Sequence, residues 1–285
     1  MKKYLLFLVF IFGFSKAQNQ RFTYEYKFVS DSTKKENIEK EFMVLDVNPK
    51  GSKFYSYEKF KADSLVTIEL ERQKNSNSEI ISIQNYYKGK IHYTISKTYP
   101  NFETFYLIGM GMDTYKVSDE RKAVWKILPV KEKTGEFNTQ KAETELFGRK
   151  WTAWFATEIP IHDGPYKFHG LPGLIVKLTD KTNSHSFELK AVKKFFENDK
   201  PKPASPFVTS PEISINQKQY QKMYLELRND PAKTLREMLS QGGEMKLIGQ
   251  DGKELNPADE IRKREQKGKE DRAKDNNIIE LDMLK

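Results

Sequence analysis

The chain has 285 residues and a formal net charge of +9, from 49 basic and 40 acidic side chains. It contains no cysteine, which excludes disulfide bonds and thiolate metal sites. Nucleic-acid binding would require a concentrated basic stripe, whereas the basic residues here are spread along the chain and mostly matched by nearby acids. Stability must therefore come from burial, and 14 Tyr and 19 Phe supply core side chains that favour strands.

The first 17 residues have the pattern of a secretory signal peptide. Lys2 and Lys3 form a basic start, an apolar run follows, and Ser15 and Ala17 are small residues at the cleavage positions. The apolar run is much shorter than the roughly 20 residues of a membrane-spanning helix. We therefore expect cleavage after Ala17, a mature chain with a charge of +6 after the loss of three lysines, no transmembrane or lipid anchor, and a periplasmic or otherwise exported location in the cell envelope.

The mature chain begins with many short strand patterns. Phe22, Tyr24, Tyr26 and Phe28 alternate with polar residues, which predicts a strand with one buried aromatic face. One amphipathic helix is predicted over 56–72, with Leu65 and Ile68 among its apolar positions. Further strands are predicted at 41–47, 79–83, 90–99, 104–108, 113–117, 124–128, 138–147, 150–156, 174–179 and 186–196. This succession favours a mainly β fold, with an antiparallel sheet curled into a bowl or partly open barrel.

The composition and periodicity of the sequence change after residue 199. Residues 200–206 form a stiff, proline-rich connector, and helical periodicity follows at 216–228 and 232–240. From Asp251 onward charges of both signs dominate, which predicts a solvated helix or a disordered tail. The predicted organisation is a signal peptide (1–17), a β domain with C-terminal helices (18–250) and a charged tail (251–285).

Residues 151–178 form the densest motif region. An aromatic strand is followed by a loop rich in proline and glycine and then by a second strand, so the loop should hold one shape. We predict that this loop is a structural lock, with Leu171 and Leu174 as buried anchors. The candidate binding or motif residues are Trp151, Trp154, Pro160, Gly164, Pro165, Tyr166, Phe168, Gly170, Leu171, Pro172 and Gly173.

The run Gly170-Leu171-Pro172-Gly173-Leu174-Ile175 resembles the motif of the GLPGLI family, a group of envelope proteins from Bacteroidetes. The preceding 164–168 and the ending 277–281 are similar to that family's pattern as well. The resemblance implies secretion and a β fold, and it brings no established catalytic residues. It also implies a fold-level likeness to the non-catalytic, bowl-shaped module of a bacterial peptide N-glycosidase, and a partner such as a TonB-dependent outer-membrane transporter.

The residues that could carry chemistry are few. His162, Asp163 and His169 are weak candidates for metal ligands, since their spacing matches no standard zinc pattern and loop histidines usually form simple hydrogen bonds. His92 and His185 are interpreted as surface or core histidines. The sequence has no nucleophile elbow, phosphate loop or HExxH motif, so we assign no catalytic residue and no cofactor, and an enzymatic role is disfavoured.

Three functional hypotheses remain at this stage. The first is a non-catalytic accessory module for an outer-membrane partner, which would use its rigid loop or sheet edges. The second is a periplasmic protein that binds a small ligand, a glycan or a peptide in an aromatic-lined pocket. The third is a hydrolase, which would need a cleft with converging titratable groups.

Overall fold

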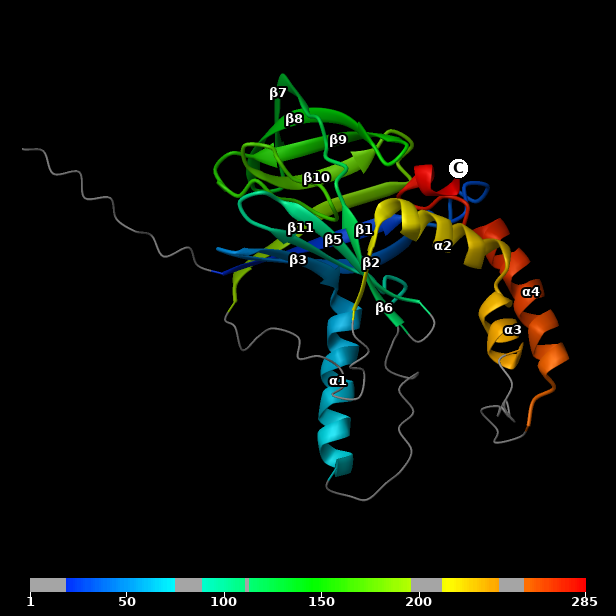
Figure 1. The fold of residues 1–285 in the computed structure, drawn as a ribbon. Helices are drawn as coiled ribbons and strands as arrows, with labels where there is room; N and C mark the ends of the chain where they lie inside the picture. The colour runs from blue at the N-terminus through cyan, green and yellow to red at the C-terminus, as the bar shows by residue number, and fades with distance from the viewer. Residues whose placement is uncertain (1–18, 75–88, 111–112, 196–211, 241–253) are drawn as a thin grey trace, which may run out of the picture.

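A computed structural model describes residues 19–74, 89–110, 113–195, 212–240 and 254–285 (Figure 1). The predicted signal peptide, the strand at 79–83 and the connector at 200–206 lie outside these residues. The strands are β1 (Gln20–Phe28), β2 (Glu39–Asn48), β3 (Gly51–Ser56), β4 (Thr94–Thr98), β5 (Glu103–Met110), β6 (Asp113–Asp119), β7 (Lys126–Thr134), β8 (Phe137–Leu146), β9 (Arg149–Ala156), β10 (Leu174–Asp180), β11 (His185–Lys194) and β12 (Ile213–Asn216). The helices are α1 (Tyr57–Lys74), α2 (Gln217–Asn229), α3 (Lys233–Ser240), α4 (Pro257–Lys274) and a final 3-10 turn, η3 (Leu281–Leu284).

The strands form one sheet in the order β12-β6-β5-β4-β3-β2-β1-β11-β10-β9-β8-β7. The pairings are antiparallel except that of β12 with β6, which is parallel. The predicted mainly β class, with a largely antiparallel sheet, one inserted helix and C-terminal helices, is confirmed. The curling of the sheet into a bowl or barrel and the division into domains stay predictions. No helix among the described residues is both long enough and apolar enough to cross a membrane.

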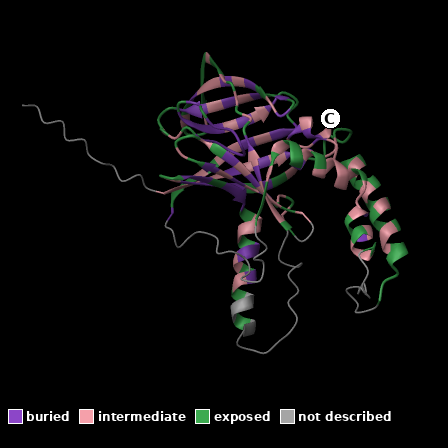
Figure 2. Cartoon of the chain, viewed as in Figure 1, coloured by how far each residue is buried: buried purple, intermediate pink, exposed green. Residues whose placement is uncertain are grey.

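The period-two pattern of β1 fixes its orientation in the sheet. Phe22, Tyr24, Tyr26 and Phe28 are all buried, as predicted, and the alternate residues are partly exposed. Phe147 and Gly148 both have positive φ, at 59° and 73°, and form the hairpin turn between β8 and β9, the two strands predicted at 138–147 and 150–156. Buried residues gather in the body of the sheet, whereas α4 contains none (Figure 2).

The predicted buried face of α1 is wrong. Leu65 and Ile68 are 49% and 62% exposed, whereas Ala62 and Val66 are buried. The helix begins directly where β3 ends and contacts β2 and β3. The direction of the chain at the end of β3 therefore sets which face of α1 packs against the sheet. Hydrophobic spacing alone does not contain that constraint.

Other predicted elements need smaller corrections. The strand predicted at 90–99 is confined to 94–98, and the one predicted at 124–128 runs from 126 to 134. The short strand β12 was not predicted, because its four residues directly precede a helix. Asn216 caps α2 by accepting a hydrogen bond from the Gln219 backbone N–H, and the Gln219 side chain reaches back, which completes a capping box.

Candidate functional site

The motif loop, defined here as residues 157–173, connects β9 to β10 and reaches well beyond these strands. It contacts Ser52 of β3 and Lys97 of β4, although four strands separate β4 from β10 in the sheet. The loop therefore crosses the sheet instead of extending into solvent. Its residues from Asp163 to His169 are all buried.

A fully buried ion pair holds the loop in place. Lys97 pairs with Asp163, and both side chains are 0% exposed. The Lys97 ammonium also donates hydrogen bonds to the backbone carbonyls of Gly164 at 2.9 Å, Tyr166 at 3.0 Å and Phe168 at 3.4 Å. One side chain thus satisfies three loop carbonyls that would otherwise be buried without partners.

Asp163 is equally well satisfied. Its carboxylate accepts hydrogen bonds from Ser52 at 2.6 Å, from Tyr99 at 2.5 Å and from the Gly164 backbone N–H at 2.6 Å. Burial lowers the pKa of Lys97, while the neighbouring Asp163 charge opposes that shift. Because the pair is covered on all sides, it positions the loop and cannot touch a substrate.

Two glycines shape the loop. Gly173 has φ +156°, and a Cβ added there would overlap the backbone carbonyl of Ala156. Gly170 has φ +97° and open space around the Cβ position, where the nearest atom is a Trp125 carbon at 4.0 Å. Gly173 is therefore required by a close backbone approach as well as by its dihedral angle, and Gly170 by its dihedral angle alone.

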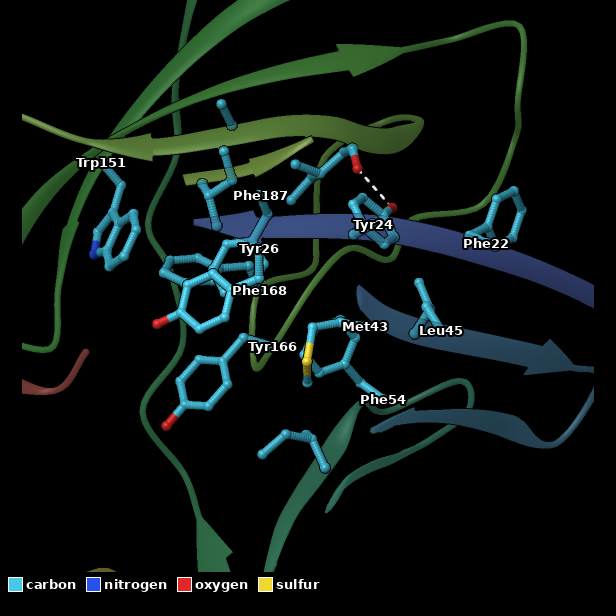
Figure 3. Packing of buried hydrophobic residues seen from close by; sticks show 14 of the residues in the cluster. Phe22, Tyr24, Tyr26, Met43, Leu45, Phe54, Trp151, Tyr166, Phe168 and Phe187 are labelled. Carbon is cyan, nitrogen blue, oxygen red and sulfur yellow. Dashed lines mark hydrogen bonds between the residues drawn. The ribbon is translucent and has the colours of Figure 1, made fainter. Parts of the chain in front are cut away.

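The aromatic motif residues Trp151, Tyr166 and Phe168 join the core. Trp151, Tyr166 and Phe168 are at most 2% exposed, and the rings of Trp151 and Phe168 meet edge to face with centroids 4.9 Å apart. Figure 3 shows this cluster together with Tyr24, whose hydroxyl donates a 2.8 Å hydrogen bond to the Ile175 carbonyl.

The other predicted motif residues divide by position. The anchors Leu171 and Leu174 are 1% and 0% exposed, as predicted. Gly164 and Pro165 are buried, Trp154 is half-buried, and Pro160, Gly170 and Pro172 are exposed. The exposed prolines thus stiffen the loop at its surface and do not line a pocket.

The three weak metal candidates do not converge. His162 is exposed, while Asp163 is engaged by Lys97, Ser52 and Tyr99. His169 is 8% exposed and stacks on Phe102 with ring centroids 4.6 Å apart. Among the described residues, no group of three or more His, Asp or Glu side chains is placed to hold a metal ion. His169 is therefore a packing residue.

The C-terminal segment, defined here as residues 275–285, packs into the same core. Arg149, at the start of β9, donates to the carbonyls of Asn277, Ile278 and Ile279 at 3.2, 2.7 and 3.1 Å. It also forms a buried ion pair with Asp180 at 3.1 Å. One guanidinium thus satisfies three consecutive backbone carbonyls of the C-terminal segment.

A second buried charge cluster joins the motif loop to this segment. The Lys167 ammonium lies 2.7 Å from Asp119 and 2.5 Å from Glu280, and Arg121 binds the same two carboxylates. The Tyr166 hydroxyl donates a hydrogen bond to the Glu280 carboxylate. Burial opposes ionisation, yet the hydrogen bonds and charges of Arg121 and Lys167 lower the pKa of Asp119 to about 2, and Lys167 and Arg121 lower that of Glu280 as well.

A cavity of about 1020 Å³ lies beside these clusters, between the sheet and the C-terminal helices. This volume is at the upper end of the range for small-molecule sites. The wall includes rings from five parts of the fold: β1, the segment before β4, β5, the motif loop and α2. Its tyrosines are Tyr26, Tyr93, Tyr106, Tyr166, Tyr220 and Tyr224.

Two wall residues, Tyr93 and Glu39, have a buried oxygen without a hydrogen-bond partner among the described residues, although the Glu39 carboxylate forms an ion pair with Lys90. Tyr93 is 9% exposed, and its hydroxyl has no hydrogen-bond partner among the described residues. By contrast, the Tyr26 hydroxyl lies 2.6 Å from Nδ1 of His185, and Tyr166 bonds to Glu280. A buried hydroxyl without a partner costs free energy, and because the Tyr93 oxygen is itself buried, it is not exposed to the open cavity.

Sequence reasoning missed Lys97, Arg149, Tyr93 and Glu280. A lysine in a short strand, or a glutamate in a charged tail, is normally solvated, so residue type indicated the wrong environment. The only available signal was the resemblance of the ending 277–281 to a family pattern. That resemblance marked the segment without showing what it binds.

Acid should destabilise this protein through its buried histidines. Burial, reinforced by the Arg149 charge, lowers the pKa of His185 to about 4, against about 6.5 in an unfolded chain. The unfolded chain therefore takes up the proton first, so this contribution to stability is present above pH 6.5 and is lost as the pH falls towards 4. Between pH 7 and pH 4.5 the loss from His185 should be about 2 kcal/mol.

Urea unfolding at several pH values measures this loss. The variant His185→Gln should be less stable at pH 7 but should have a flatter pH dependence between 6.5 and 4.5. The exposed histidine variant His92→Gln is the control and should retain the slope of the original protein. Equal slopes for His185→Gln and His92→Gln would contradict the assignment.

Comparisons with known proteins give a family match over part of the chain. No curated protein matches. Eight solved chains match, among them structures of PNGF-II in the P21 and C2 space groups, each with 16% sequence identity and a TM-score of 0.48. These matches cover 74% of this chain and 34% of the other, so this chain spans about a third of that protein's length. Residues 50–177, which include most of the sheet and the whole motif loop, match the family described as "Protein of unknown function (Porph_ging)".

Proposed function

We propose that this chain is an exported protein of a bacterial cell envelope that binds a small ligand in the tyrosine-lined cavity. The observation that carries the proposal is the cavity itself, whose wall contains six tyrosines. The N-terminal signal pattern and the resemblance to the GLPGLI family support the exported location. The burial of the motif loop supports a structural, non-catalytic role for that loop.

Thermal melting tests this proposal. The mature protein, beginning at Gln18, should melt at a higher temperature when small molecules extracted from the envelope are added. A ligand at about 100 times its dissociation constant adds about 2.7 kcal/mol of stability. The variant Tyr220→Ala removes one ring from the wall and should lose this stabilisation. An extract that leaves the melting temperature of the original protein unchanged would speak against a ligand site.

A second candidate is the accessory role, and one observation favours it. Strand β7 is an edge of the sheet, and it exposes Ile127 and Val130, which are 46% and 48% exposed, close to Val124 at 85%. An edge strand with exposed apolar side chains can pair with a strand of another protein. The proposed partner is an outer-membrane protein such as a TonB-dependent transporter.

Capture from detergent-solubilised envelope membranes tests the accessory role. The original protein should retain a TonB-dependent transporter, and Val130→Lys should release it, because a charge on an edge strand opposes pairing. Val192→Lys is the matched control, since Val192 is 44% exposed on the internal strand β11. Equal capture by both variants would exclude β7 as the contact.

A further inference from the structure

We infer that the tyrosine-lined cavity binds a free fatty-acid anion, with the hydrocarbon chain inside the cavity and the carboxylate at its rim. This inference rests on the proposed function and names its ligand class. The cavity joins two environments. It extends from Tyr26 and Met283, which are 2% and 4% exposed, to Lys34 and Lys267, which are exposed. A ligand that occupies its whole length therefore needs one part suited to each environment.

The polar groups of the inner wall already have partners or are covered. The Tyr26 hydroxyl lies 2.6 Å from Nδ1 of His185, and the Tyr166 hydroxyl is bonded to Glu280. The Tyr93 oxygen is buried and is not open to the cavity. A saccharide or a peptide in this part of the cavity would lose its hydration without gaining hydrogen bonds, which disfavours both ligand classes.

Aliphatic side chains complete the inner wall. Ile278 and Ile279 of the C-terminal segment and Ile91, in the segment before β4, line the cavity and are half-buried. They lie in the same wall as Phe28 of β1. Because these residues are only partly covered by the fold, they offer hydrocarbon surface to a ligand. Transfer of each methylene group from water to such a surface is favourable, so affinity should rise with the length of the chain.

The charges at the rim, defined here by Lys34, Lys267 and Lys274, favour an anion. None of these three lysines forms an ion pair within the part of the chain that the structure describes. By contrast, four of the five acids that line the cavity are engaged: Glu39 by Lys90, Asp275 by Arg228, Glu280 by Lys167, and Asp31 by Thr33. The fifth acid is Asp271, so three unpaired lysines face one unpaired carboxylate, and the rim can attract the head of a fatty-acid anion.

Calorimetry on the full mature protein tests the inference. The charged probes are decanoate, laurate and myristate, and the contrasting probes are 1-dodecanol, which has the chain of laurate without its charge, and maltotriose. Each lengthening of the chain by two carbons should strengthen binding about tenfold. Laurate should bind more tightly than 1-dodecanol at low salt, and added salt should reduce this difference, because the rim lysines are exposed.

Matched variants separate the rim from the wall. The double variant Lys267→Gln with Lys274→Gln should weaken laurate binding about fivefold and leave 1-dodecanol binding unchanged. The control is Lys263→Gln with Lys269→Gln, which removes the same charge from exposed positions of α4 outside the cavity lining and should bind laurate like the original protein. Ile91→Ala should weaken both amphiphiles, and its melting temperature without ligand shows whether it is folded.

The outcomes distinguish the ligand class from the proposed function. Binding of maltotriose without any fatty acid, or fatty-acid binding that does not depend on chain length, would overturn the ligand class. Adsorption to vesicles of anionic phospholipid, lost in the Lys267 and Lys274 double variant and unaccompanied by fatty-acid binding, would assign the rim to a membrane surface instead. Stabilisation by envelope extract would leave the proposed function standing in each case. A failure of every probe, together with no stabilisation by the extract, would overturn both.

Discussion

Replacing Lys97 with methionine should lower the free energy of unfolding by about 3–5 kcal/mol, the usual cost of removing one partner from a buried ion pair. Methionine keeps the apolar, unbranched character of most of the side chain but leaves the Asp163 carboxylate buried without a cation and three loop carbonyls without their donor. Urea unfolding followed by tryptophan fluorescence measures the change, since Trp151 is buried beneath the loop residue Phe168.

The matched control is Lys53→Met, because Lys53 is an exposed lysine on the neighbouring strand β3. It should change stability by less than about 0.5 kcal/mol. The double variant Lys97→Met with Asp163→Asn removes both charges and should regain part of the lost stability. If Lys97→Met lowered the free energy of unfolding no more than Lys53→Met, the ion pair of Lys97 with Asp163 would not stabilise the loop.

Replacing Gly173 with valine should cost at least about 3 kcal/mol, because two penalties combine at this position. Its φ of +156° disfavours a β-branched residue, and the new Cβ would overlap the Ala156 carbonyl and lie 2.9 Å from Cα of Thr157. Both obstacles are backbone atoms of the chain leaving β9, so a side-chain rotation cannot relieve them. Thermal melting and urea unfolding of the variant provide the measurement.

Gly170→Val separates the two penalties. It imposes an unfavourable φ of +97° but meets open space, so it should cost about 1–3 kcal/mol from backbone strain alone. A Gly173→Val variant that is as stable as Gly170→Val would show that the approach of the loop to Ala156 is relieved by a backbone shift.

The sequence was informative wherever a local pattern decides the structure. The aromatic alternation of β1, the hairpin at Gly148 and the buried anchors Leu171 and Leu174 all follow from residue type and spacing within a few positions. These features do not depend on distant partners, because strand period and glycine dihedral angles act over a single turn or strand. The motif loop was therefore recognisable as a rigid packing element.

The residues that complete the site depend on contacts between distant positions. Lys97 meets the loop carbonyls 67 to 71 residues away, and Arg149 meets the C-terminal segment 128 to 130 residues away. A strand lysine or a tail glutamate has the same local pattern whether it is solvated or buried. For the same reason the cavity was expected only as a hypothesis, since its tyrosines come from elements that the fold alone brings together.

The docked C-terminal segment has a consequence for the order of folding during synthesis. Arg149 and Lys167 are buried cations whose acceptors include Asn277 and Glu280, among the last ten residues of the chain. Until those acceptors have been synthesised, burying either cation without them would cost free energy. The core around Arg149 and Lys167 is therefore incomplete in the nascent sheet. Residues 275–285 therefore complete the core only after the strands of the sheet and the motif loop have been synthesised.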